Sequence, residues 1–193
     1  MTFKLILIRH GQSTWNDKNL FTGWEDVGIT QTGRDEAVQA GALLKKHNHL
    51  PDVSHTSLLR RAITAGNIVL DAADRHWIPI KKSWKLNERH YGVSQGLNKE
   101  NMAEKYGDET EALKDVVERV EPYWKESIIP DMKAGKTVLV TAHGDSLRAL
   151  VKILDCVGDE KVMELNILTG VLIVYELNDG RRPVVKGGDW LQE

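Results

Sequence analysis

Two histidine–glycine pairs follow two short apolar segments of the chain. Residues 9–11 (RHG) come directly after the apolar run 3–8, and residues 143–144 (HG) come directly after the run 138–142. Runs of this kind are typical of strands in a parallel sheet that is covered on both faces. Ligands of such sheets bind outside the carboxyl ends of the strands, so both pairs are expected at one edge. Either histidine alone fits an ordinary loop role, whereas the two together, beside an arginine, indicate a reaction site.

Phosphoryl transfer is the chemistry that suits these residues. Histidine with an unprotonated ring nitrogen can attack as a covalent nucleophile, and transfer of a phosphoryl group depends mainly on positioning and on cations that stabilise charge. Arg9 adjoins His10, and Arg61 lies in the first turns of an expected helix. Each arginine could contact two phosphate oxygens at once. His143 could hydrogen-bond the charge that develops.

Such a transfer also needs an acid or base for the attacking or leaving oxygen. Glu88 lies in the segment 86–91 (LNERHY), among groups that could bind anions, and is the candidate. A surface salt bridge with Arg89 is the alternative interpretation of the same carboxylate.

Strands and helices alternate along the chain. The patterns predict strands at residues 3–8, 52–56, 77–80, 138–142 and 171–175. They predict helices that begin near Thr32, Ser57 and Ser146, and a further helix with Leu113, Val116, Val117 and Val120 on one face. The predicted fold class is therefore α/β, a single three-layer domain with a mainly parallel sheet and helices on both faces. A turn at 178–180 (NDG) predicts one antiparallel edge strand.

Length and composition fit one globular domain that spans residues 1–193. The net charge of −2 argues against nucleic acid or an acidic membrane as a partner. No apolar run approaches the roughly 18–20 residues of a membrane span, and the first residues do not fit a signal peptide, so a cytoplasmic location is expected. One cysteine, Cys156, cannot form an internal disulfide or a multi-cysteine zinc site. His47 and His49 do not share a helical face, and no metal is expected.

Five segments carry a resemblance to a known family: residues 9–16 (RHGQSTWN), 21–33 (FTGWEDVGITQTG), 58–65 (LLRRAITA), 86–99 (LNERHYGVSQGLNK) and 142–152 (AHGDSLRALVK). Nearly end to end, the chain resembles the cofactor-dependent phosphoglycerate mutases of the histidine phosphatase superfamily. RHG alone indicates only the superfamily, whereas FTGW and LNERHYG are typical of the mutase branch.

The resemblance implies an enzyme that interconverts 3-phosphoglycerate and 2-phosphoglycerate in glycolysis and gluconeogenesis. It implies that His10 is phosphorylated during turnover and that Glu88 donates and accepts protons. The catalytic residues that it implies are His10, Glu88, His143, Arg9 and Arg61. The substrate-binding residues that it implies are Arg9, His10, Gly11, Gln12, Ser13, Thr14, Trp15, Asn16, Thr22, Gly23, Arg61, Glu88, Arg89, His90, Tyr91, Lys99, Gly144 and Asp145. It also implies priming by 2,3-bisphosphoglycerate without a metal, and leaves a homodimer or homotetramer open.

The sequence departs from the family pattern at three places. Asp145 stands where the family has asparagine, and its charge should weaken phosphate binding unless it points away or pairs with Arg148. Residues 167–170 (ILTG) replace IPTG, which would alter only a turn. Most members follow the stretch 104–109 with a long segment that carries two adjacent arginines and closes over the substrate. Here that lid segment is missing after Glu109, which predicts weaker substrate binding and more hydrolysis.

Two other functions stay open from the sequence. A phosphohistidine phosphatase for small phosphate esters fits the missing lid arginines. A catalytically impaired homologue that acts by binding is the second alternative, although the five catalytic residues implied by the resemblance are all present and argue against it.

Overall fold

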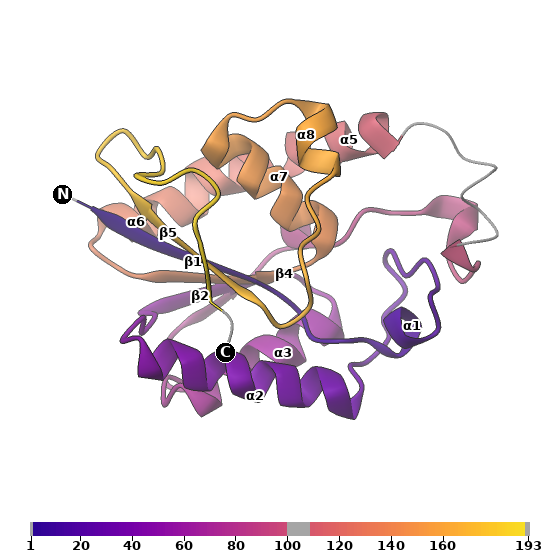
Figure 1. Ribbon diagram of the computed structural model, residues 1–193, viewed down its shortest axis with the longest axis horizontal. Coiled ribbons are helices and arrows are strands. Elements are labelled where there is room, and N and C mark those ends of the chain that lie inside the picture. Colours follow the sequence, from indigo (N-terminus) through magenta and orange to yellow (C-terminus); the bar gives the residue numbers. More distant parts are fainter. Residues whose placement is uncertain (1, 100–108, 192–193) are drawn as a thin grey trace.

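A six-stranded sheet forms the middle layer of the protein (Figure 1). The computed structural model describes residues 2–99 and 109–191. The strands are β1 (Phe3–Arg9), β2 (Val53–Thr56), β3 (Ile80–Lys82), β4 (Val138–Ala142), β5 (Leu172–Leu177) and β6 (Asp189–Leu191). Their order across the sheet is β3-β2-β4-β1-β5-β6.

The first four strands run parallel, and the last two add the antiparallel edge. β4 lies between β1 and β2, and β3 pairs with β2, all in parallel. β5 is antiparallel to β1, and β6 is antiparallel to β5 beyond the predicted turn, where the amide of Arg181 donates to the carbonyl of Asn178. The predicted α/β class is confirmed. β3 lies later than the predicted strand 77–80, because Trp77 stays two-thirds exposed (66%).

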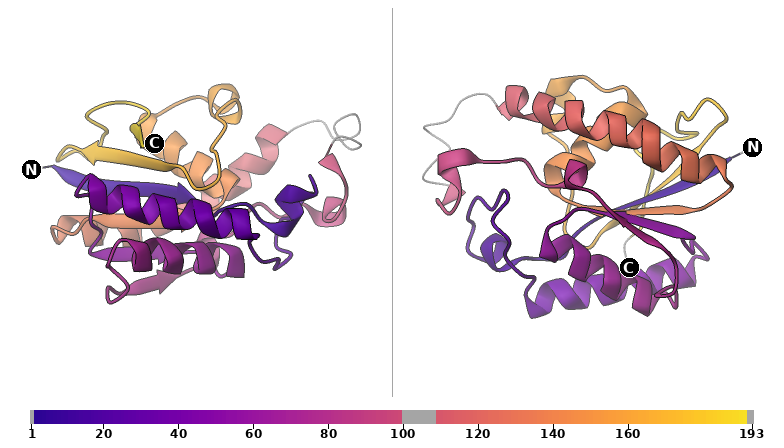
Figure 2. Two further views of the ribbon diagram at one scale, coloured as in Figure 1. Left: turned by 60° about the horizontal axis from the view of Figure 1, so that its bottom comes forward. Right: turned by 180° about the vertical axis from the view of Figure 1, so that it is seen from behind.

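Helices cover both faces of the sheet and complete the three layers (Figure 2). α2 (Gln31–Lys46) and α3 (Arg60–Ala72) pack on the face of β1 that buries Ile6 and Ile8. α5 (Glu109–Tyr123) and α7 (Gly144–Asp155) pack on the opposite face, over Leu5 and Leu7. Burial on alternate sides explains why β1 is apolar throughout. The shorter segments are α1 (Thr14–Asp17), α6 (Ile129–Lys133), α8 (Asp159–Met163), 3-10 turns at Trp84–Leu86 and Gly92–Ser94, and a π-helical turn at Trp124–Ile128.

Three helices begin at other residues than predicted. Thr30, not Thr32, caps α2, and its hydroxyl accepts a hydrogen bond from a helix amide at 3.1 Å. Ser57 does not open α3: Leu59 precedes the helix, and the Ser57 hydroxyl accepts from the amide of Leu59 and also bonds His143. Ser146 lies inside α7, and its hydroxyl accepts from the amide of His143, the residue that precedes the helix. The last two differences both place a serine next to the second histidine.

The lid segment is predicted to be missing after Glu109, and residues 100–108, which lead to this point, lie outside the described residues. α5 begins at Glu109. Within residues 2–99 and 109–191, no helix is long and apolar enough to cross a membrane.

Candidate active site

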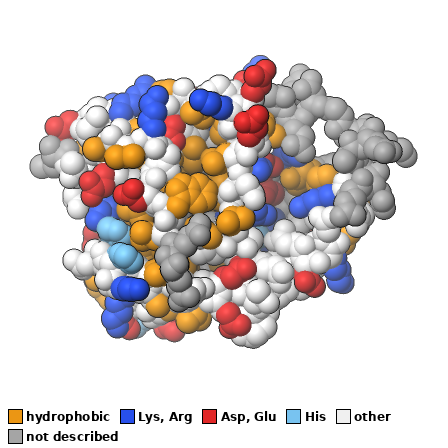
Figure 3. All heavy atoms as spheres, viewed as in Figure 1, with side chains coloured by type: hydrophobic (Ala, Val, Ile, Leu, Met, Phe, Trp, Pro, Cys, Tyr) orange, Lys and Arg blue, Asp and Glu red, His pale blue; other side chains and the backbone are white. Residues whose placement is uncertain are grey.

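The two histidines that follow β1 and β4 meet at the carboxyl edge of the sheet. The register pairs Arg9 with Ala142, and the amide of His10 donates to the carbonyl of Ala142 at 3.0 Å. The imidazole rings of His10 and His143 lie edge to face with centroids 4.9 Å apart, and both are buried. This edge faces α1 in Figure 1, and Figure 3 shows charged side chains of both signs in a hollow on the same side.

The contacts of His10 define which ring nitrogen is free to react. Nδ1 lies 2.8 Å from the carbonyl oxygen of Gly11, which can only accept, so Nδ1 carries the proton. Arg61 Nε donates to His10 Nε2 at 3.3 Å, which requires a lone pair on Nε2. Both contacts give the same tautomer, with Nε2 as the nucleophilic atom.

The charge state of both histidines suits nucleophilic chemistry. Burial, followed by the charges of Arg61 and Arg9, holds the pKa of His10 well below its usual value. Burial and then Arg61 also hold the pKa of His143 well below its usual value. Both imidazoles are therefore neutral at neutral pH, and Nε2 of His10 keeps its lone pair.

Arg61 is held rigidly in the middle of the site. It is 1% exposed, and its two terminal nitrogens donate to the carbonyls of Gly23 (2.7 Å) and Glu25 (2.9 Å). Gly23 has φ of +55°, a left-handed conformation that favours glycine, and this turns its carbonyl towards the guanidinium. The predicted substrate residue Thr22 is buried beside it.

Arg9, Glu88 and Gly144 converge on one point. A Cβ on Gly144 would lie 3.7 Å from Oε2 of Glu88 and 3.8 Å from Cζ of Arg9. Arg9 is fixed by a hydrogen bond from Nη1 to the carbonyl of Ile167 at 2.8 Å. Among the described residues its buried Nε has no hydrogen-bond partner, so one donor at this point is available to an anion.

Glu88 is a buried carboxyl suited to proton transfer. Its Oε1 accepts from the amides of Arg89 (2.9 Å) and Asp145 (3.1 Å). Burial and then the carboxylate of Asp145 raise the pKa of Glu88, and these effects outweigh the amide of Arg89 and the charges of the nearby arginines. A carboxyl with a raised pKa can both accept and return a proton near neutral pH. The burial of Glu88 is inconsistent with a surface salt bridge.

Asp145 pairs with Arg148, which is one of the two arrangements in which its charge was not expected to weaken phosphate binding. Its Oδ1 lies 2.8 Å from Arg148 Nη1. Its Oδ2 faces Arg89 Nε at 3.4 Å and accepts from the hydroxyl of Tyr91 at 3.3 Å. Asp145 therefore also engages two residues that the resemblance assigns to substrate binding.

The remaining predicted residues of the segment 86–99 divide into two groups. Arg89 lies over the ring of Tyr91, with Cζ 4.5 Å from its centroid, beside Asp145. Burial and then Arg9 lower the pKa of Lys99, and Glu88 and Asp145 raise it, so Lys99 shares the electrostatic environment of the site. His90 is exposed and accepts from the amide of Gly92.

The loop 11–16 is fixed mainly by its own contacts. Gly11 lies against the backbone of α2, where a Cβ would come 2.1 Å from a carbonyl oxygen, so only glycine fits there. Ser13 and Asn16 cap α1 reciprocally, and Gln12 accepts from Thr30 at 2.8 Å. Thr14 is exposed and Trp15 is partly buried.

Two residues of this region were not among the predicted site residues. Ser57 follows β2 at the same edge of the sheet, and its hydroxyl lies 2.8 Å from His143 Nε2. Its position directly after a strand could have indicated that it lies in the site. Arg119 on α5 donates to the carbonyls of Trp84, Lys85, Asn87 and Glu88 at 2.6–3.3 Å. Its guanidinium thus holds the backbone that carries Glu88 and is not turned to a substrate.

The described part of the chain contains no group of three or more His, Cys, Asp or Glu side chains that could hold a metal ion. The chemistry of the site rests on a neutral histidine, two arginines and a buried carboxyl.

This arrangement corresponds to a known class of protein. Residues 5–189 match the family model of the histidine phosphatase superfamily (branch 1), and the chain belongs to that superfamily. Within it, the chain is similar to a 2,3-bisphosphoglycerate-dependent phosphoglycerate mutase from Nocardioides sp., with 49% identity over 99% of this chain and 93% of the relative. A mutase of the same name from Rhodococcus jostii is 50% identical over 98% of this chain and 91% of the relative. The first alignment spans 230 residues, whereas this chain has 193, so the relative holds residues that this chain lacks.

Solved structures with low sequence identity share the fold. Bacillus stearothermophilus YhfR superposes with a TM-score of 0.80 at 24% identity and covers 96% of this chain and 97% of its own. Phosphoglycerate mutase from Bacillus anthracis superposes with a TM-score of 0.76 at 20% identity, and the match covers 100% of this chain and 92% of that structure. A mycobacterial glucosyl-3-phosphoglycerate phosphatase superposes with a TM-score of 0.76 at 22% identity, and the match covers 99% of this chain and 97% of that structure.

Proposed function

We propose that the chain interconverts 3-phosphoglycerate and 2-phosphoglycerate through a phosphorylated His10, primed by 2,3-bisphosphoglycerate. The observation that carries the proposal is the neutral His10, whose unprotonated Nε2 accepts from Arg61 and whose ring contacts that of His143. The names of relatives about 49% identical supply the substrate class.

The residues act as follows in the proposed reaction. His10 Nε2 takes up a phosphoryl group from the primer and so becomes phosphohistidine. The free hydroxyl oxygen of the monophosphate then attacks phosphorus, the bond between phosphorus and Nε2 breaks, and Glu88 accepts the hydroxyl proton. After the doubly phosphorylated molecule has reoriented, Nε2 attacks its other phosphoryl group and Glu88 returns the proton to the leaving oxygen.

The cations of the site fit a phosphate ester with a carboxylate. Arg9 and Arg61 flank His10 and can compensate the charge of the transferring group, and the free Nε of Arg9 is a donor for one of its oxygens. Lys99, which senses the charges of Arg9 and Glu88, and Arg89, which faces Asp145, would meet the rest of the substrate. The remaining predicted substrate residues line the same loops or support them.

A phosphatase acting on small phosphate esters is the second candidate function. It is favoured by the difference in length from the mutase relatives, which supports a missing lid segment, because water would then reach phosphohistidine more easily. The presence of all five proposed catalytic residues, with His10 and Arg61 buried together, argues against an impaired homologue that only binds. We further propose a cytoplasmic location, as phosphoglycerates require, and a homodimer or homotetramer by analogy with the family.

Phosphorus NMR separates the candidates. The protein is incubated with 3-phosphoglycerate and catalytic 2,3-bisphosphoglycerate, beside His10→Ala as the control. Appearance of 2-phosphoglycerate that the variant abolishes supports the mutase. Inorganic phosphate without 2-phosphoglycerate would establish the phosphatase, and an unchanged spectrum would overturn both.

A further inference from the structure

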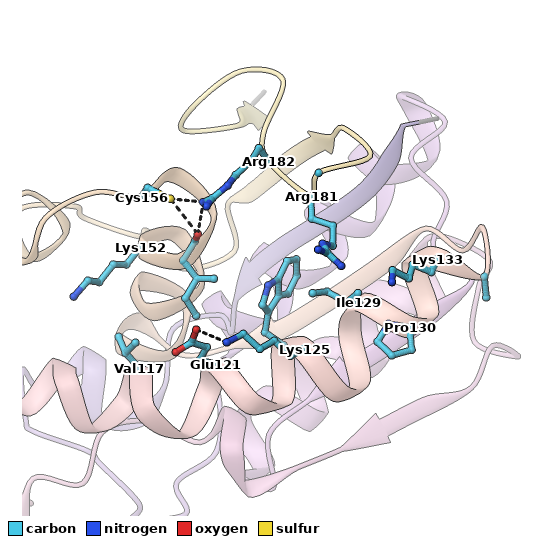
Figure 4. Close-up of a pocket in the computed structure, with 14 residues that line it drawn as sticks. Val117, Glu121, Lys125, Ile129, Pro130, Lys133, Lys152, Cys156, Arg181 and Arg182 are labelled. Atoms are coloured by element: carbon cyan, nitrogen blue, oxygen red, sulfur yellow. Dashed lines mark hydrogen bonds and ion pairs between the residues drawn. The ribbon is translucent and has the colours of Figure 1, made fainter.

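A cavity of about 970 Å³ lies away from the active site, at the end of the sheet where β1 begins. It is open to solvent and is lined by α5, the π-helical turn, α6, the end of α7 and the turn that follows β5 (Figure 4). None of the residues around His10 lines it, and the proposed reaction does not use it. Its volume is typical of a pocket for a small organic ligand.

The charge around this cavity is strongly one-sided. Lys125, Lys133, Lys152, Arg181 and Arg182 line it, whereas Glu121 is the one carboxylate among the described lining residues. Glu121 is 2.7 Å from Lys125. Lys152 pairs with Asp159, which lies outside the lining. An excess of positive charge remains after both pairs are formed, although the net charge of the whole chain is negative.

Two of these cations are available to a ligand. Within the described part of the chain, no ion pair or side-chain hydrogen bond engages Lys133 or Arg181. Figure 4 shows Arg181 pointing from the turn towards α6, where Ile129 and Lys133 lie. Arg181 has φ of +60° although it is not a glycine. The turn imposes this conformation through two hydrogen bonds between Asn178 and residues 181–182, and strained backbone of this kind is concentrated at binding sites.

The wall beneath the cations is apolar. Val117, Ile129, Pro130 and Ile153 line the cavity together with the largely buried Trp124. A small inorganic anion would contact only the charged rim and would leave this apolar surface uncovered. The surface suits a ligand with a flat or apolar body and several negative charges at one end.

We propose that this cavity binds an organic polyanion of the nucleoside di- or triphosphate class. The phosphates lie between Arg181 and Lys133, and the base packs against the wall formed by Ile129, Pro130 and Ile153. The inference does not depend on the reaction proposed at His10.

Isothermal titration calorimetry with ATP tests the site directly. We expect saturable binding that the double variant Lys133→Ala/Arg181→Ala weakens by at least about tenfold, because two charge-assisted contacts are lost. Both side chains are exposed, so the variant should fold. The double variant Lys46→Ala/Lys82→Ala, which removes two exposed lysines outside the cavity, is the charge-matched control and should bind ATP as the unmodified protein does. Inorganic triphosphate should bind more weakly than ATP, since it cannot use the apolar wall.

The single thiol provides an independent readout. Cys156 lines the cavity, is exposed and contacts Arg182. ATP should slow its alkylation by iodoacetamide in the unmodified protein and not in the double variant. Absence of saturable binding would overturn the proposal. So would binding that Arg61→Ala abolishes while the double variant and the alkylation rate are unaffected, because ATP would then occupy the active site alone.

Discussion

At the scale of single residues, Asp145 adds to the effect of burial on the pKa of Glu88. Burial contributes most to the raised pKa of Glu88, and the Asp145 carboxylate contributes next. The same carboxylate engages Arg89 and Arg148. Asp145→Asn should therefore lower the pKa of Glu88 and release positive charge towards the substrate. We expect a KM for 3-phosphoglycerate lower by about three- to tenfold, and an acid limb of kcat/KM that moves to lower pH.

The measurement is the pH dependence of kcat/KM from about pH 4.5 to 8. Asp159→Asn removes an equal charge from an exposed ion pair with Lys152 and should leave the profile unchanged. If the acid limb of Asp145→Asn stays in place while the KM falls, Glu88 does not titrate in the reaction.

At the scale of elements, α5 positions the loop that carries Glu88, the proposed proton donor and acceptor. Arg119 donates to four carbonyls in this loop, and Trp24 Nε1 donates to the Glu88 carbonyl at 2.6 Å. Arg119→Ala would remove one donor from each of these four carbonyls and let Glu88 shift. Because a displacement of about 1 Å can cost about a hundredfold in rate, we expect kcat to fall by that order with a smaller change in KM.

A role in positioning predicts more than a loss of stability. Arg119→Lys should restore part of kcat, and Lys114→Ala, which changes an exposed cation of the same helix, should not affect it. The pH profile of Arg119→Ala should also change, because the environment of Glu88 changes. A lowered free energy of unfolding with normal kcat at low temperature would contradict this role.

A buried histidine also joins four elements of the sheet and its helical cover. His55 on β2 bonds Tyr123 at the end of α5 (2.9 Å) and Asp131 on α6 (3.0 Å), and Asp131 also pairs with Lys81 on β3. Burial lowers the pKa of His55 to about 4, against the opposing effect of Asp131. Burial alone would raise the pKa of Asp131, but hydrogen bonds from Lys81, Lys136 and His55 lower it to about 2.

These shifts make folding stability depend on pH in a defined direction. Below about pH 6.5 the unfolded chain protonates His55 and the folded chain does not, so stability falls until about pH 4. The contribution is about 1.4 kcal/mol per pH unit for this histidine. The test is urea unfolding at pH 7 and at pH 5. Between these two pH values, the free energy of unfolding should fall by about 2 kcal/mol less in His55→Gln than in the unmodified protein. An equal loss in both would mean that His55 does not titrate in this range.

At the scale of the whole molecule, the sequence predicted the fold class, the strands β1, β2, β4 and β5, and the meeting of His10 with His143. These follow from apolar runs and from a rule about strand ends, which are local signals. It did not predict that Ser57 turns to His143 or that Arg119 reaches the Glu88 loop. Both are contacts between distant segments. The position of Ser57 after a strand could have indicated the edge of the sheet at which it lies, but nothing in the local pattern around Arg119 indicates its partners.

The difference in length from the mutase relatives leads to a prediction about the balance of two reactions. The Nocardioides relative aligns over 230 residues, and this chain has 193. If the residues that it lacks form the lid expected after Glu109, the substrate loses two charge-assisted contacts and water has freer access to phosphohistidine. Measured side by side with that relative, this chain should show a higher KM for 3-phosphoglycerate and a larger ratio of inorganic phosphate released to 2-phosphoglycerate formed. His10→Ala serves as the blank for both products. Equal KM values and equal ratios would show that the described site binds and shields the substrate without such a lid.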